Sequence, residues 1–302
     1  MDPECHLENL DCSGPGPSRR LQRGRPLRTM NQRLCLEALR AVANAGPPYE
    51  EAFLALLEAD PRAGARALLG ACRRRQERVV NEEARLGAMM IHEEEARRNG
   101  FARIAGVDEA GRGPLAGPIV AAAVVLAAPV AGLDDSKRLT AEQRERLFVA
   151  LHRGGHAIGV GLVQAEEIDH WGIQPANYSA MAQAVRRLEP PPDFLLVDGF
   201  TIPGAPIPQQ RLIKGDRRSL SIAAASIVAK VIRDRTMREL DRQYPEYGFG
   251  KHKGYGTAEH LAAVRRYGAC PAHRKSFAPI AEVPETAQLF TEKVEDIARC
   301  ER

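Results

Sequence analysis

The 302-residue sequence predicts an α/β protein in which helices pack on a mixed β-sheet. Short apolar runs rich in Val, Ile and Leu begin after residue 100 and are typical of strands. Between and after these runs, apolar side chains recur at the spacing of amphipathic helices. The order of strands first, then helix, strand and helix, indicates a mixed sheet flanked by helices, with a helical N-terminal extension and a helical C-terminal region.

The composition excludes several classes of protein. Hydrophobic residues make up 44% and charged residues 27% of the chain, as in an ordinary globular protein. No apolar stretch reaches the roughly 20 residues that cross a membrane, and the N-terminus lacks the basic start and apolar core of a secretory signal. The six cysteines form no C-x-x-C pair, which argues against a zinc site or a disulfide framework. We therefore expect a cytoplasmic protein without membrane contact.

Changes of composition divide the chain into four segments. Residues 1–30 are rich in Gly, Pro, Ser and Arg and predict a disordered basic tail, either a nucleic-acid-binding arm or a segment without a role. Residues 31–100 predict a helical N-terminal extension, in which one helix begins at Asp60-Pro61. Residues 101–285 predict the main α/β domain with a helical C-terminal part, and residues 286–302 a C-terminal tail.

The strands and helices of residues 101–285 are expected in alternation. Strands are predicted at 103–108, 119–126 and 157–163, with shorter runs at 194–199 and 209–216. A capping box of Thr140 and Gln143 begins the first helix. Further helices are predicted near 177–189, from Ser221 to Gln243, and from a cap at Thr257 to a stop at Gly268.

Carboxylates follow three of the strand-like runs: Asp108 with Glu109, then Asp198, then Asp216. Strand ends of this kind meet at one edge of a sheet. Two carboxylates about 4 Å apart repel by roughly 4 kcal/mol at an effective dielectric near 20, so such a cluster requires protonation or a divalent cation. Oxygen ligands without a His/Cys set indicate Mg²⁺ or Mn²⁺, and two such ions support in-line attack at phosphorus. Taken singly, each acid is also typical of a turn.

Strand alternation affects the first pair of acids. Neighbouring residues of a strand point to opposite faces, so Asp108 and Glu109 would not face one ion from a regular strand. We therefore expect the strand to end or bulge there, as Gly106 and Gly111 permit.

The turn Gly111-Arg112-Gly113 is not a nucleotide-binding loop. It lacks the GK[ST] ending, and a strand rather than a helix follows it. Glycines let a ligand approach the bare backbone closely, and bare amides beside a phosphodiester site are suited to a ribose 2′-hydroxyl. Arg112 is then placed to bind a phosphate. A tight turn between two hairpin strands is the alternative.

Six motifs, in the order and approximate spacing of one known family, resemble bacterial ribonuclease HII from residue 101 to about residue 280: DEAGRGPLAGP, DDSKRL, LLVDG, IKGD, SIAAASIVAKVIRD and YGFGKHKGYGT. The region 60–100 also resembles the N-terminal extension of some bacterial members. The resemblance implies an RNase H-like fold and endonucleolytic cleavage of RNA in RNA/DNA hybrids and of single ribonucleotides in duplex DNA. It implies a cut 5′ of the ribonucleotide that leaves 3′-hydroxyl and 5′-phosphate ends. It also implies a role in DNA replication and repair.

The resemblance also assigns residues. It implies that the metal-binding and catalytic acids are Asp108, Glu109, Asp198 and Asp216, with Mg²⁺ or Mn²⁺ as cofactor and two ions during catalysis. It implies that substrate is bound by Gly111, Arg112, Gly113, Ser136, Lys137, Lys230 and Tyr255, with the tyrosine packing on the sugar at the RNA-to-DNA junction. Asp135 and Asp234 are expected to hold basic side chains rather than metal. Type HIII relatives usually carry a different N-terminal module and a different fourth acid, so HII is preferred.

Basic residues around the last acid agree with backbone phosphate contacts: Arg211, Lys214, Arg217, Arg218, Lys230, Arg233 and Arg235. The resemblance assigns no role to His252, His260 and His273, which we expect in loops or on helix surfaces. A monomer is expected. Two alternatives stay open: a DNA-directed nuclease or transposase of the same superfold, and a non-catalytic nucleic-acid-binding protein, in which the acids would only repel phosphate.

Overall fold

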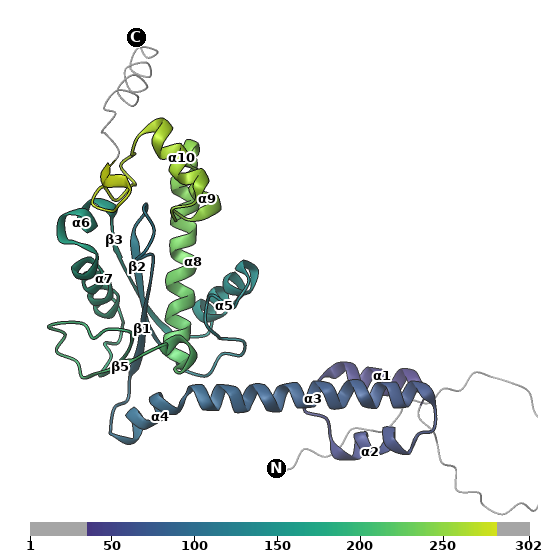
Figure 1. Cartoon of the computed structure of the whole chain (residues 1–302). Coiled ribbons are helices and arrows are strands. Elements are labelled where there is room, and N and C mark those ends of the chain that lie inside the picture. Colours follow the sequence, from purple (N-terminus) through teal and green to yellow (C-terminus); the bar gives the residue numbers. More distant parts are fainter. Residues whose placement is uncertain (1–34, 283–302) are drawn as a thin grey trace, which may run out of the picture. The chain divides into compact units, whose positions relative to one another are not determined.

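The structure, a computed structural model, describes residues 35–282 of the chain (Figure 1). The tails expected at 1–30 and 286–302 lie outside these residues. None of the helices within 35–282 combines the length and the apolar character that crossing a membrane requires. The chain divides into two compact units between Arg73 and Arg74. The domain boundary at residue 100 stays a prediction.

The first unit consists of three helical pieces. Helices α1 (Leu36–Ala45) and α2 (Glu51–Ala59) and the start of α3 (Ala63–Met89) bury a small apolar cluster that includes Leu39 and Cys72. Helix α3 begins later than the expected start at Asp60-Pro61, because the Asp60 carboxylate accepts hydrogen bonds from the backbone and the guanidinium of Arg62 and forms a turn ahead of the helix.

The second unit contains a five-stranded mixed sheet in the order β3-β2-β1-β4-β5. The strands are β1 (Ile104–Ala110), β2 (Ile119–Val125), β3 (Ala157–Val163), β4 (Phe194–Asp198) and β5 (Gln209–Leu212). Strands β1, β2 and β3 pair antiparallel, whereas β4 lies parallel to β1 and β5 parallel to β4. The acidic ends of β1 and β4 therefore lie at the same edge of the sheet.

Helices cover both faces of this sheet (Figure 1). They are α5 (Ala141–Arg153), α6 (Ala165–Trp171), α7 (Ile173–Arg186), α8 (Leu220–Gln243), α9 (Phe249–His252) and α10 (Ala258–Tyr267), with 3₁₀ turns at Gly215–Arg217 (η1), Pro245–Tyr247 (η2) and Ile280–Glu282 (η3). The capping box of Thr140 and Gln143 is present at α5, and Thr257 caps α10 as predicted. Helix α8 begins at Leu220, one residue before the expected start at Ser221, and is capped by Ser219.

The helix expected near 177–189 is longer at its start and shorter at its end. It begins at Ile173, because proline is tolerated in the first turn of a helix and Pro175 lies there. Helix α6, which the sequence analysis missed, precedes it and is capped by Gln164 and Glu167. Gly172, with φ of +82°, links the two helices.

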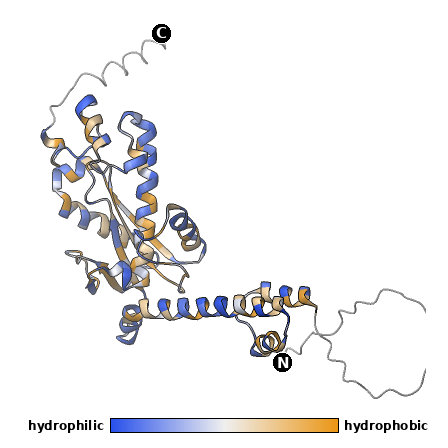
Figure 2. Cartoon of the chain, turned by 45° about the vertical axis from the view of Figure 1, so that its right-hand side comes forward, coloured by the Kyte–Doolittle hydropathy of each residue, from blue (hydrophilic) through white to orange (hydrophobic). Residues whose placement is uncertain are grey.

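Helix α8 packs on one face of the sheet and α7 on the other, each over its own apolar cluster. Gly106 of β1 lets α8 approach closely, since a Cβ atom there would lie 2.1 Å from the carbonyl carbon of Ser221. Figure 2 shows the N-terminal half of α8 as hydrophobic and its C-terminal half as hydrophilic, which matches the buried run at its start. The tight α8 contact places the start of this helix under the acidic end of β1.

The end of α3 and the whole of α4 (Ile91–Arg98) belong to this second unit. Leu86 and Met90 join the apolar cluster under α8. Glu93 is 2% exposed, and its Oε1 accepts hydrogen bonds from the Ser219 hydroxyl (2.7 Å) and from the hydroxyl and backbone N–H of Ser221 (2.7 and 3.0 Å). A buried carboxylate therefore satisfies donors at the N-terminus of α8.

Candidate active site

A cavity of about 430 Å³ opens where β1 and β4 end. Its lining holds every site residue predicted from the sequence except Asp216: Asp108, Glu109, Gly111, Arg112, Gly113, Ser136, Lys137, Asp198, Lys230 and Tyr255, together with Ala110, Ser226 and Arg233. Residues from five separate stretches of the chain meet here. The fold therefore assembles one site from segments that the sequence keeps apart.

Strand β1 passes through the two adjacent acids without ending or bulging. Asp108 pairs with Ala122, Glu109 with Ala121, and the ladder continues to Ala110. Our expectation of an interrupted strand was wrong. Asp108 interacts with Ser226 of α8, and Glu109 with Asn177 of α7, so the two carboxylates leave the strand on opposite faces. Both reach the cavity because it lies at the end of the strand.

Asp108 carries the strongest electrostatic perturbation of the group. Its side chain is 6% exposed, and burial raises its pKa well above the usual value. The charges of Glu109 and Asp198 raise it further, whereas hydrogen bonds from the Ser226 hydroxyl and from the Glu109 N–H (2.7 Å to Oδ1) oppose the shift.

Glu109 is partly neutralised by the neighbouring turn. Burial raises its pKa, the nearby Arg112 guanidinium at 3.5 Å opposes that rise, and Asp198 adds to it. The Oε2 atom of Glu109 is buried and has no hydrogen-bond partner among the described residues. Glu109 therefore keeps an acceptor with unused capacity.

Asp216 lies beside the cavity, in the η1 turn. Burial raises its pKa, as do the charges of Asp135 and Asp198, whereas Lys137 opposes the shift. The Gly215 N–H donates to Asp198 Oδ1 at 2.7 Å and ties η1 to the end of β4. The fourth acid is thus held within electrostatic reach of the others without lining the same cavity.

These acids fit a hard divalent cation in chemistry and charge. They offer oxygen donors, which Mg²⁺ and Mn²⁺ prefer. Their mutual repulsion and the unpartnered Glu109 Oε2 leave negative charge that a cation would neutralise. Among residues 35–282, no three acidic, His or Cys side chains already surround a common point as a complete ligand set.

The turn after β1 is held by a buried arginine. Gly111 has φ of +98°, and a Cβ atom there would lie 2.0 Å from Arg233 Nε, so only glycine fits. Arg233 is 1% exposed and donates to the carbonyls of Pro118 (3.1 Å) and Ala116 (3.2 Å). The expectation that Arg233 contacts phosphate was wrong, because its donors are used inside the protein.

A second buried arginine, Arg274, was missed by the sequence analysis. It is fully buried, and its guanidinium donates to the carbonyls of Gly111, Arg112, Pro114 and Gly117 at 2.5–3.0 Å. The residue lies outside the recognised motifs, in the stretch CPAHRKSF, and no local pattern distinguishes it from an exposed arginine. Its five donors brace the whole glycine turn.

Arg112 lies between acidic, amide and aromatic partners. Its guanidinium is 3.5 Å from Glu109 Oε1, donates to Gln174 Oε1 at 2.9 Å, and lies 4.9 Å from the Phe200 ring centroid. Gln174 and Phe200 come from α7 and from the segment after β4, so two further parts of the chain orient this side chain.

Tyr255 is positioned by a chain of buried histidines. Its ring is about half exposed, and its carbonyl lies 2.9 Å from His260 Nδ1. His260 Nε2 lies 3.0 Å from His273 Nε2, and the Cys270 N–H donates to His273 Nδ1 at 3.0 Å. Carbonyls only accept and N–H groups only donate, so both rings are neutral, with protons on His260 Nδ1 and His273 Nε2.

The expectation of a helix-surface position was wrong for His260, which is buried within α10, whereas His273 lies in a loop as expected but is buried there. They are 0% and 1% exposed, and burial lowers the pKa of His273 to about 4. Segment 270–274 thus braces both the glycine turn, through Arg274, and Tyr255, through His273.

The acids expected to hold basic side chains do so. Asp135 is 1% exposed and accepts from Arg217 Nη2 at 2.8 Å and from the Lys137 N–H at 2.9 Å. Asp234 accepts from Lys230 Nζ at 2.6 Å and lies 3.7 Å from Arg144. Both contacts place cations at the rim of the cavity.

Comparison with known proteins places this site in a family. The family model for Ribonuclease HII matches residues 105–280, and the model for the Ribonuclease HII N-terminal domain matches residues 40–97. The chain is 53% identical over 255 residues to Ribonuclease HII of Geobacillus kaustophilus, covering 84% of this chain and 96% of the relative. It is 51% identical over 238 residues to Ribonuclease HII of Myxococcus xanthus, covering 78% and 81%.

Solved structures agree. Ribonuclease H2 from Pyrococcus horikoshii aligns with a TM-score of 0.52 at 29% identity, over 60% of this chain and 97% of that one. The structure of the PCNA:RNase HII complex from Archaeoglobus fulgidus aligns with a TM-score of 0.51 at 25% identity, over 58% and 95%. The acidic strand ends, the braced glycine turn and the matched relatives lead to one conclusion. The chain belongs to the ribonuclease HII family and is a ribonuclease H, a hydrolase that cleaves RNA/DNA hybrids endonucleolytically.

Proposed function

We propose that this chain is a divalent-metal-dependent endoribonuclease that acts on the RNA strand of RNA/DNA hybrids and on single ribonucleotides embedded in duplex DNA. We further propose a cut 5′ of the ribonucleotide, leaving 3′-hydroxyl and 5′-phosphate ends. One observation carries the proposal: Asp108, Glu109 and Asp198 line the same cavity as the Gly111–Gly113 turn and Tyr255. Groups suited to phosphodiester hydrolysis thus face groups suited to a ribose.

Four acids are proposed to hold the metal: Asp108, Glu109, Asp198 and Asp216. Mg²⁺ or Mn²⁺, as two ions when bound, would supply activation of water and stabilisation of the leaving oxygen. The chain itself keeps Asp108 in place through Ser226 and the Glu109 N–H, and holds Asp198 through the Gly215 N–H. These hydrogen bonds orient the carboxylates before substrate arrives.

Selection of RNA is proposed to come from the glycine turn. Arg274 donates to the carbonyls of Gly111 and Arg112, and Arg233 donates to that of Pro118 further along the same loop, so hydrogen bonds restrain the backbone at the cavity wall. Rigid bare amides beside the scissile bond suit a 2′-hydroxyl, which DNA lacks. Tyr255, about half exposed and near Gly113, is proposed to pack on the sugar at the junction.

The remaining cavity residues are proposed to bind the backbone. Ser136, Lys137 and Lys230 line the cavity and carry a hydroxyl and two ammonium groups suited to phosphate. The proposed partners are RNA/DNA hybrids and ribonucleotide-containing duplex DNA, bound by a cytoplasmic monomer that acts in DNA replication and repair.

One assay tests the proposal. The protein is incubated with Mg²⁺ or Mn²⁺ and three duplexes: an RNA/DNA hybrid, DNA with one ribonucleotide, and all-DNA of the same sequence. We expect metal-dependent cuts in the first two alone, with product ends mapped by a phosphatase and a 3′-extension assay. Cutting of all-DNA duplex at the same rate would favour a DNA-directed nuclease, and cutting in EDTA would overturn the metal dependence.

A further inference from the structure

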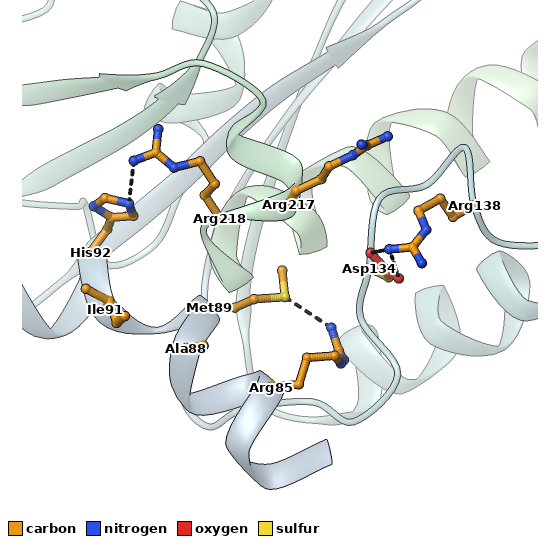
Figure 3. A pocket seen from close by; sticks show the side chains of 9 residues that line it. All are labelled: Arg85, Ala88, Met89, Ile91, His92, Asp134, Arg138, Arg217 and Arg218. Atoms are coloured by element: carbon orange, nitrogen blue, oxygen red, sulfur yellow. Dashed lines mark hydrogen bonds and ion pairs between the residues drawn. The ribbon is translucent and has the colours of Figure 1, made fainter. Parts of the chain in front are cut away.

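A second cavity, of about 530 Å³, is lined by residues of α3, α4, the loop before α5 and the η1 region (Figure 3). Four arginines and one histidine line it against a single carboxylate: Arg85, His92, Arg138, Arg217, Arg218 and Asp134. These side chains come from the α3–α4 junction, from the loop before α5 and from η1 and the residue after it. We call this cavity the basic pocket.

Three of the four arginines have carboxylate partners. Arg85 is bound by Glu82 through Nε and Nη2, both at 2.8 Å, Arg138 by Asp134 at 3.0 Å, and Arg217 by Asp135 at 2.8 Å. A guanidinium carries five N–H groups, so each keeps donors that its carboxylate does not use. The side chains of Arg138 and Arg217 are 62% and 54% exposed, which leaves them accessible to a ligand.

Arg218 differs from the other three. No carboxylate among residues 35–282 lies within ion-pair distance of it, and its Nη2 lies 3.4 Å from His92 Nε2 (Figure 3). Because the guanidinium only donates, His92 Nε2 accepts and the ring proton lies on Nδ1. That Nδ1 is buried and has no hydrogen-bond partner in the described part of the chain. Arg218 is thus a cation without an anionic partner among the described residues.

The loop before α5 contributes neighbouring residues to the basic pocket and to the active-site cavity. Asp134 and Arg138 line the pocket, whereas Ser136 and Lys137, between them in sequence, line the cavity. Arg217 directly follows Asp216 in η1. A duplex carries one phosphate per roughly 1.7 Å of its axis, so any duplex in the active site also presents phosphates to the adjoining surface.

We propose that the basic pocket binds a backbone phosphate of the substrate that flanks the scissile phosphodiester, with Arg218 as its principal ligand. Arginine is suited to this because its planar fork grips phosphate in a bidentate manner. The proposal rests on the proposed function and gives the end of the N-terminal extension, through Arg85 and His92, a part in substrate binding.

The experiment measures duplex binding apart from cleavage. Fluorescence anisotropy in EDTA gives Kd for a DNA duplex with one ribonucleotide, over a range of salt concentrations. For Arg218→Ala we expect Kd to rise about tenfold, since bonds to charged groups are of that size, and the slope of log K against log salt to fall by about 1. Arg218→Glu should weaken binding further. Arg186→Ala, an exposed arginine on α7 across the sheet, is the matched control.

Duplexes shortened from one end or the other locate the contact. We expect the difference in Kd between Arg218→Ala and wild type to disappear when the duplex end that reaches the basic pocket is trimmed away. The difference should persist when the opposite end is trimmed. If Arg218→Ala bound every duplex more weakly than wild type, whichever end was trimmed, the lost contact would lie at the scissile site and the proposal would be overturned. Equal Kd values for Arg218→Ala and Arg186→Ala would also overturn it. Tight binding of inorganic phosphate with unaltered duplex binding would indicate a free-anion site and also overturn it. Failure of wild-type cleavage would instead count against the proposed function, so the two outcomes are distinguishable.

Discussion

At the residue scale, the candidate active site is a place where like charges are forced together. Asp108, Glu109 and Asp216 all have raised pKa values, with burial as the largest cause in each. A folded protein without a cation bears this cost, because desolvation and repulsion both disfavour the charged forms. Such an arrangement is typical of sites selected for binding or catalysis rather than for stability.

We expect Asp108→Asn to lower the cleavage rate at least about 100-fold, since even loss of groups that only support a metal ligand costs 10–100-fold. Substrate binding should survive, because the amide keeps the shape and removes a negative charge that repels phosphate. Rates on the single-ribonucleotide duplex and Kd in EDTA measure the two effects. Glu142→Gln, an exposed carboxylate at the start of α5, is the control. Near-normal turnover by Asp108→Asn would remove this residue from the proposed metal site.

The histidine chain makes a separate prediction. His260→Ala removes the donor to the Tyr255 carbonyl. For this variant, and likewise for Tyr255→Ala, we expect KM for the single-ribonucleotide duplex to rise more than KM for a long hybrid. His260→Asn should restore part of the difference, since its amide replaces the Nδ1 donor. Steady-state kinetics on both substrates provide the measurement. An equal loss on both substrates, unrelieved by Asn, would mean that the histidines serve stability alone.

At the element scale, the N-terminus of α8 joins three parts of the second unit. It packs against β1 through Gly106, follows the η1 turn that carries Asp216, and receives the buried Glu93 of α4. The family's N-terminal extension is thus joined to the element that supports the acids. Strand β1 needs no bulge, because the cavity lies at its end and both acids reach it from a regular strand.

Glu93→Ala tests this connection. The change leaves two buried hydroxyls and one N–H without their carboxylate, and each unmet donor costs about 1–3 kcal/mol. We expect the free energy of unfolding to fall by about 2–4 kcal/mol in urea titrations. Glu95→Ala, an exposed glutamate on the same helix, should stay within about 0.5 kcal/mol of wild type. Equal stabilities of the two variants would show that α4 contributes little to the fold of this unit.

At the scale of the whole molecule, the acids link stability to pH and to metal. A carboxyl group whose pKa is raised by folding stabilises the fold below its ordinary pKa, and this contribution is lost as pH rises through the folded value. The shifts of Asp108, Glu109 and Asp216 therefore predict, in EDTA, a loss of stability as pH rises above the ordinary carboxyl range.

Divalent metal should reverse that loss, because a cation replaces the protons. We expect Mg²⁺ or Mn²⁺ to raise the free energy of unfolding more at pH 8 than at pH 5, where protons compete for the same oxygens. Urea unfolding at pH 5 and at pH 8, with metal or with EDTA, measures this stabilisation. In Asp108→Asn the increase in the free energy of unfolding on metal addition should be smaller. Equal stabilisation at both pH values would contradict a site made of these carboxylates.

Sequence alone was sufficient for those features that depend on local pattern. Short apolar runs predicted all five strands, and capping residues predicted the starts of α5 and α10, because such runs and caps act over a few residues. The four acids and the glycine turn could also be predicted as site residues from the sequence, because their residue types and spacing indicate the chemistry and belong to the family motifs. The missed helix α6 has a cap but only a short apolar pattern.

Only the tertiary structure decided which polar residues serve the site and which serve the fold. Arg233, Arg274, His260 and His273 look like surface residues in sequence, yet all four are buried. Burial depends on contacts between residues far apart in the chain, such as Arg274 with Gly111, which no local pattern records. The sequence thus determined the chemistry of the acids and the turn, and long-range packing determined how rigidly they are held.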